Sequence, residues 1–147
     1  MLFTTVKFLH LLAVMLLFSA SLIKNLLLGQ ASIQSQTMRW CRTADRISGA
    51  AAGLVVLSGI GLLYLSPKGA GFYTANSFFW LKIGLLVFAS ALIIRTKLFF
   101  REQAKLVGAG PVDVPRSVVN ILKFDLASLV LMAYLGVVVV NGISLQR

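Results

Sequence analysis

Residues 2–28 read LFTTVKFLHLLAVMLLFSASLIKNLLL, an apolar run whose only ionisable residues are Lys7, His10 and Lys24. About 20 apolar residues in a helix cross the hydrocarbon core of a bilayer, so this stretch predicts a membrane-spanning helix. A cleaved signal peptide is the alternative, because residues 19–21 are small. The apolar run, however, continues to Leu28 and is longer than a typical signal core, which favours the span.

Three further apolar runs follow, over about residues 47–65, 78–100 and 118–143. They are continuous rather than alternating, which favours helices over the strands of a barrel. Of the 147 residues, 59% are hydrophobic and 12% are charged, and this is about half the charge of a typical soluble domain. The composition excludes a disordered chain and argues against a soluble enzyme. We therefore predict an all-α integral membrane protein, a four-helix bundle in one membrane domain (1–147) whose first helix covers about residues 2–28.

Positive charge is concentrated in two connections, at residues 29–46 and 95–123 and at the span ends beside them. Ten of the fourteen basic residues lie there: Lys24, Arg39, Arg42, Arg46, Arg95, Lys97, Arg101, Lys105, Arg116 and Lys123. Because excess Lys and Arg stays cytoplasmic, we expect both loops in the cytoplasm and both termini in the periplasm, in a bacterial inner membrane. The net charge of +10 is then explained by the membrane topology and by contact with anionic lipid headgroups. We expect the lipid bilayer as a partner, and no nucleic acid.

The candidate site lies near the outer end of the bundle, around His10, the one histidine of the chain. His10 is about 10 Å along the first helix at 1.5 Å per residue, Lys7 is one turn earlier on the same face, and we expect Lys82 at a similar depth. Ionisable groups inside a span are costly and mark functional candidates. His10, Lys82 and Lys7 are thus the candidate cofactor-binding residues. His10 is also the candidate metal ligand, to haem iron or another metal, or a proton relay.

Structural roles for the same residues stay open. Lys7 and Lys82 are close enough to the interface to extend their amines into it. His10 could instead hydrogen-bond a neighbouring helix. A single histidine also excludes bis-histidine haem ligation within one chain.

Two acidic residues open the second and fourth spans. Asp45 and Asp125 are favoured there by the helix dipole, and Asp45 could pair with Lys24 and Asp125 with a nearby arginine. Gly49 and Gly53 form a small-residue face that permits close helix approach. We expect packing roles for these four residues.

Two further structural candidates lie in the connection at residues 66–77 and just after it. Asn76 precedes the third span and is a plausible N-cap. Trp80 belongs with Phe72, Tyr73 and Phe79 to an aromatic belt, which is typical of a membrane interface.

Together these residues resemble a family of small four-helix bacterial membrane proteins known as a domain of unknown function. The motifs that carry the resemblance span nearly the whole chain: Phe8-Leu9-His10, Ala44-Asp45-Arg46, Lys68-Gly69, Phe72-Tyr73, Asn76 and Phe79-Trp80-Leu81-Lys82. Lys24 stands where an acidic residue is typical of that family.

A weaker resemblance reaches the HemJ-type protoporphyrinogen oxidase family. Residues 7–10 (Lys-Phe-Leu-His) are similar to its Lys-x-Leu-His opening, and Trp80 and Lys82 are similar to its Trp and Lys in the third span. The Trp, the Arg and the second histidine that follow in that family are missing. The resemblance implies tetrapyrrole binding, with haem b as the possible cofactor, and leaves enzymatic activity open.

Two hypotheses of different classes therefore remain for a protein of unknown function. The first is a haem- or tetrapyrrole-binding membrane protein with His10 as ligand and Lys82 nearby. The alternative is an accessory or structural subunit, in a homo-oligomer or a larger membrane complex, with no chemistry of its own. A small transporter is disfavoured because the acids lie at the ends of the expected spans rather than within them.

Overall fold

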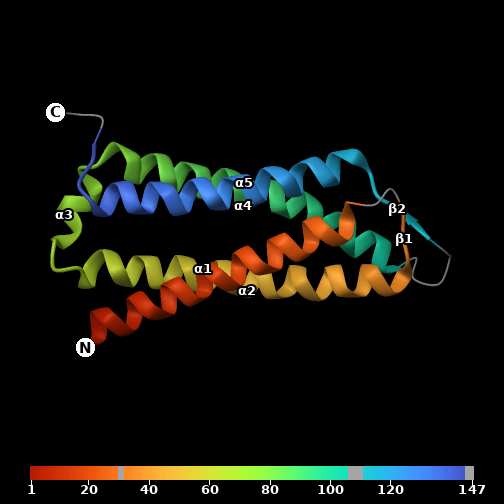
Figure 1. Cartoon of the computed structure of the whole chain (residues 1–147), viewed down its shortest axis with the longest axis horizontal. Helices are drawn as coiled ribbons and strands as arrows, with labels where there is room; N and C mark the ends of the chain where they lie inside the picture. Colours follow the sequence, from red (N-terminus) through yellow and green to blue (C-terminus); the bar gives the residue numbers. More distant parts are fainter. Residues whose placement is uncertain (30–31, 106–110, 145–147) are drawn as a thin grey trace.

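The computed structural model describes residues 1–29, 32–105 and 111–144. Within these residues the long helices are α1 (Leu2–Leu28), α2 (Ser35–Leu65), α4 (Ser77–Lys105) and α5 (Arg116–Val140). A short helix, α3 (Gly69–Thr74), joins α2 to α4, and the two-residue strands β1 (Ser32–Ile33) and β2 (Val112–Asp113) precede α2 and α5 (Figure 1).

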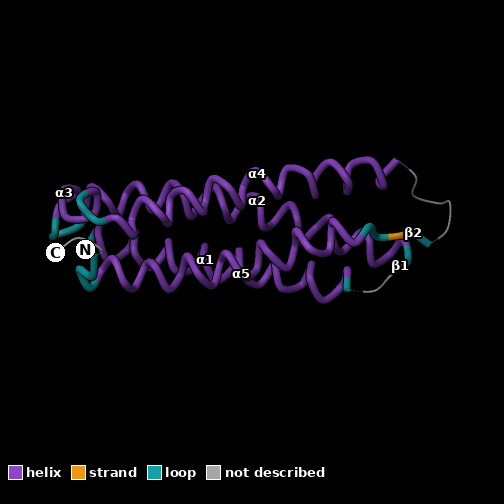
Figure 2. The backbone as a smooth tube through the Cα atoms, turned by 90° about the horizontal axis from the view of Figure 1, so that it is seen from above, coloured by secondary structure: helices purple, strands orange, loops and turns teal. Residues whose placement is uncertain are grey.

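The four long helices form an up-down-up-down bundle. α1 packs mainly against α2, and α4 against α5, while α1 also contacts α5 and α2 contacts α4. The N-terminus and α3 lie at one end of the bundle, which we call the α3 end, and both strands lie at the other, the strand end (Figures 1 and 2). Each long helix has the length and apolar composition of a membrane span. The predicted all-α, four-helix membrane fold is therefore confirmed.

The outside of the bundle is apolar over much of its length. Leu57 is 68% exposed, Val87 65% and Val137 60%. In water such a surface would be costly, whereas acyl chains cover it at no such cost. The spans therefore have the surface that a bilayer requires.

Two of the long helices extend further toward the strand end than the sequence predicted. The helix expected at 47–65 begins at Ser35, and the helix expected at 78–100 continues to Lys105, while the last one covers Arg116–Val140 rather than 118–143. α2, with 31 residues, is about 46 Å long at 1.5 Å per residue and exceeds a hydrocarbon core of about 30 Å. The loops predicted at 29–46 and 95–123 are thus largely helical extensions. Residues 30–31 and 106–110 of those loops lie outside the described residues.

The extensions enclose a hydrophobic core at the strand end. Its buried members come from α1, β1, α2, α4, the residue after β2, and α5: Leu28, Ile33, Met38, Cys41, Phe100, Val114, Val118 and Leu122. Antiparallel pairing of β1 with β2, Ser32 with Asp113 and Ile33 with Val112, ties the two connections together over this core. The polar helix ends on this side of the bundle are thus stabilised by packing against one another.

The α3 end is closed by polar contacts to the backbone. Asn76 caps α4, since its Oδ1 accepts the Phe78 backbone N–H at 2.9 Å, and its Nδ2 donates to the Ile143 carbonyl at 2.8 Å. Lys68 Nζ donates to the Val140 carbonyl at 2.6 Å. The first bond caps the start of α4, and the other two satisfy carbonyls at and just beyond the end of α5.

The strand-end core yields a matched prediction on one helix. Leu122→Ala removes a fully buried side chain, and we expect a loss of about 2–5 kcal/mol in the free energy of unfolding. Leu131→Ala makes the same change at a side chain that is 47% exposed, and we expect a much smaller loss. Reversible unfolding in mixed micelles, followed by circular dichroism, measures both. Equal losses would show that the strand end has no core of its own.

Candidate functional site

His10 lies on the side of α1 that faces α2. Its Nδ1 is 2.9 Å from the Ser58 hydroxyl oxygen. A Cβ placed on Gly59 would lie 3.6 Å from His10 Cε1, so a glycine at that position leaves room for the ring against the α2 backbone. The imidazole is partly buried, and the contact with Ser58 holds it at Nδ1.

The contacts of Ser58 determine which ring nitrogen of His10 carries the proton. The Ser58 hydroxyl donates to the Leu54 backbone carbonyl one turn earlier, with the Val55 carbonyl 3.3 Å away. A hydroxyl has one proton to donate, so Ser58 Oγ accepts a hydrogen bond from His10 Nδ1–H. The lone pair of the neutral imidazole is then on Nε2, which is the arrangement of a histidine whose second nitrogen binds a metal.

Lys82 brings a positive charge to the same level of the bundle. It is partly buried on α4, and its Nζ lies 3.2 Å from where a Cβ on Gly136 of α5 would be. Lys82 interacts electrostatically with His10. His10 and Lys82 therefore lie within electrostatic range of each other, each beside a glycine of a neighbouring helix. Lys7, the third candidate, is exposed.

The groups at this site limit the metals that it could hold. Among the residues that the structure describes, no three His, Cys, Asp or Glu side chains come together as a metal site. In that part of the chain His10 therefore belongs to no three-ligand site, and it suits a metal that takes one or two protein ligands. Haem iron fits this requirement because the porphyrin supplies four nitrogens and the protein one or two axial ligands.

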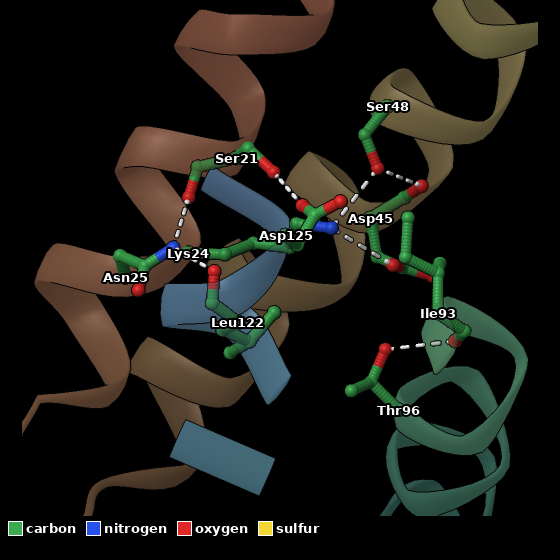
Figure 3. Close-up of polar contacts among 9 residues, drawn as sticks. All are labelled: Ser21, Lys24, Asn25, Asp45, Ser48, Ile93, Thr96, Leu122 and Asp125. Carbon is green, nitrogen blue, oxygen red and sulfur yellow. Dashed lines mark hydrogen bonds and ion pairs between the residues drawn. The ribbon is translucent and has the colours of Figure 1, made fainter. Parts of the chain in front are cut away.

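A second polar cluster lies nearer the strand end, around Lys24 (Figure 3). Lys24 is 0% exposed. Its Nζ forms an ion pair with Asp45 Oδ1 at 3.3 Å and donates to Ser48 Oγ at 3.1 Å. The predicted pairing of Asp45 with Lys24 is thus present, inside the bundle rather than at a solvated helix end.

Asp125, from α5, completes this cluster with a different partner from the one expected. The sequence suggested an arginine, whereas Asp125 Oδ2 accepts a hydrogen bond from the Ser21 hydroxyl of α1. Asn25 Nδ2 donates to the Leu122 carbonyl at 2.9 Å and to the Ser21 carbonyl at 3.0 Å. α1 is therefore joined to α2 and to α5 by buried polar contacts.

The sequence model of a family described as "Predicted membrane protein (DUF2214)" matches residues 3–144. The chain belongs to this family. No curated protein and no solved structure matches it.

In this DUF2214 chain, the glycines that meet another helix are not all those singled out from the sequence. A Cβ on Gly61 would lie 3.3 Å from Val6 Cγ1, and one on Gly49 would lie 3.1 Å from Lys97 Nζ, whereas Gly53 has nothing within 4 Å. Close approach of α1 to α2 thus occurs at Gly59 and Gly61, and Gly49 accommodates a lysine.

Trp80 lies at the start of α4 and is 57% exposed. Its Nε1–H donates to the Thr74 carbonyl at 2.8 Å, and its ring meets Phe79 edge-on, with 5.5 Å between centroids. An exposed indole with its polar edge satisfied at a span end is typical of a membrane interface.

Sequence reasoning missed Ser21, Asn25 and Ser48 as members of the Lys24 cluster. One signal was available, since Ser21, Lys24 and Asn25 lie within four residues of one another on α1 and therefore close to one face. What the sequence did not show was how α2 packs against α1, which brings Ser48 to Lys24.

The contacts of His10 predict its tautomer. With one histidine in the chain, a single imidazole signal in nitrogen-15 NMR of the protein in nanodiscs reports it. We expect the neutral ring to carry its proton on Nδ1, and Ser58→Ala to shift the ring toward a mixture of tautomers. Gly53→Ala, which fills open space on the same helix, should leave the signal unchanged. A wild-type ring protonated on Nε2 would contradict the geometry.

Proposed function

We propose that this membrane protein binds haem or a related tetrapyrrole at the α3 end, with His10 as an iron ligand and Lys82 near a propionate. The observation that carries the proposal is an imidazole whose Nε2 is not held by Ser58, within electrostatic range of an ammonium group that forms no ion pair among the described residues. Bound haem would supply an iron centre for electron transfer or oxygen chemistry.

Lys82 is the residue of this site that would bind an anionic group. Within the described residues the one ion pair is that of Lys24 with Asp45, so Lys82 faces the bundle without a carboxylate. A partly buried ammonium inside a span is costly unless it is paired. A ligand with an apolar body and a carboxylate, such as a tetrapyrrole with its propionates, would neutralise this charge.

The orientation in the membrane belongs to the same proposal. The strand end carries most of the basic residues, so the positive-inside rule places it in the cytoplasm and the His10 site near the periplasmic surface of a bacterial inner membrane. A site at that depth would take its ligand from the bilayer or from the periplasm.

An accessory role without chemistry is the second candidate, and exposed glycines favour it. Gly53 on α2 and Gly84 on α4 have nothing within 4 Å and are exposed. In lipid, such positions allow a helix of another subunit or a second copy to approach closely.

Absorption spectroscopy of the purified protein tests the tetrapyrrole proposal. We expect a Soret band after purification or after titration with hemin, lost in His10→Ala and weakened in Lys82→Met. Lys7→Met is the matched control, because Lys7 lies one turn from His10 and is exposed, and it should leave the band unchanged.

Two outcomes would count against haem binding. A folded protein that stays colourless and does not bind added hemin would exclude it, as would a band that His10→Ala leaves intact. If the colourless protein also co-purified with another membrane protein in stoichiometric amount, the accessory role would be supported instead.

A further inference from the structure

The Lys24 cluster contains more carboxyl groups than cations. Lys24 is 0% exposed, Asp45 8% and Asp125 2%. If all three were ionised, the cluster would carry one uncompensated negative charge in a buried place. The penalty for such a charge in a protein interior is of the order of several kcal/mol.

Lys24 forms an ion pair with one of the two carboxylates, that of Asp45. Its ammonium binds Asp45 Oδ1 and Ser48 Oγ, both from α2 (Figure 3). In the described part of the chain Asp125 forms no ion pair, and its partner is the neutral Ser21 hydroxyl. Asp125 is therefore a buried carboxyl group held only by a neutral hydrogen bond.

Among the described residues, Lys24 is the one cation that acts electrostatically on Asp125. Lys24 of α1 and Asp45 of α2 act on it electrostatically with opposite sign. Cys41 of α2 is a buried thiol within the electrostatic range of Lys24. From α4, the buried Thr96 hydroxyl bonds the Ile93 carbonyl at 2.8 Å, and the exposed Lys97 ends against Gly49.

We propose that the Lys24–Asp45–Asp125 cluster binds one exchangeable proton, carried by Asp125 while Lys24 pairs with Asp45. When the proton leaves, both carboxylates compete for one ammonium, and Lys24 moves from Asp45 toward Asp125. The proton thus belongs to the coupled pair of carboxyl groups rather than to one residue.

Proton exchange at this cluster would change how the helices are joined. Lys24 connects α1 to α2 through Asp45, whereas a Lys24–Asp125 pair would connect α1 to α5. Uptake and release of one proton would therefore move contacts between the two helix pairs. The cluster acts in this way whether or not the His10 site binds a ligand.

Infrared spectroscopy of the full chain in phosphatidylcholine nanodiscs tests the proposal. We expect a carbonyl stretch from one protonated carboxylic acid in sodium-free buffer near neutral pH, lost as the pH is raised. Labelling with carbon-13 aspartate should shift the band, which assigns it to Asp45, Asp113 or Asp125 and not to Glu102.

Three variants and a control then locate the proton. Asp125→Asn should abolish the band. Asp45→Asn should abolish it as well, because Lys24 is then free to pair with Asp125. Lys24→Met should raise it about twofold, since neither carboxyl group keeps a cation. Asp113→Asn, at an exposed position of β2, should leave the band unchanged.

A measurement on the wild-type protein can overturn the proposal even if a variant fails to fold. Absence of a protonated aspartic acid near neutral pH would refute it. A band that survives in folded Asp125→Asn would do the same. Loss of the band on addition of sodium would reassign the cluster from a proton to a metal cation.

Discussion

The buried ammonium of Lys24 is the constraint on which the arrangement of the helices depends. An uncompensated charge is not tolerated where neither water nor headgroups reach it, so the chain must bring an acidic group to that place. Asp45 does so from α2, with Ser48 accepting a further hydrogen bond. This requirement fixes the rotation and axial position of α1 relative to α2, and Ser21 and Asn25 then bind α5 to the same face of α1.

The two ends of the bundle differ because of where the polar residues lie. At the strand end, α2 and α4 continue beyond the length that a bilayer needs, and their extensions pack around Met38, Phe100 and Leu122 as a soluble core would. At the α3 end, the polar contacts go to backbone carbonyls, and His10 and Lys82 lie within electrostatic range of each other.

Hydropathy predicted the number, type and order of the spans, because a run of about 20 apolar residues has few alternatives in a membrane. It did not predict that α2 begins at Ser35, since Arg39, Arg42 and Arg46 make that region polar. The helical spacing of Met38, Cys41, Ala44, Asp45 and Ser48, all buried, would have predicted the extension. The cap at Asn76 was predicted from its position before a helix, and the Lys24–Asp45 pair from opposite charges at neighbouring span ends. The Ser21–Asp125 contact depends on how α5 packs and has no signal in the local sequence.

A double-mutant cycle on Lys24 and Asp45 tests the central claim most directly. The free energies of unfolding of Lys24→Met, Asp45→Asn, the double variant and the wild type would be measured in the same micelles. The account predicts a coupling energy of about 1–3 kcal/mol, because each single variant already breaks the Lys24–Asp45 ion pair and the double variant loses no further pair. Losses that add to within about 0.5 kcal/mol would show that the buried ammonium does not depend on Asp45, and would contradict this account of the bundle.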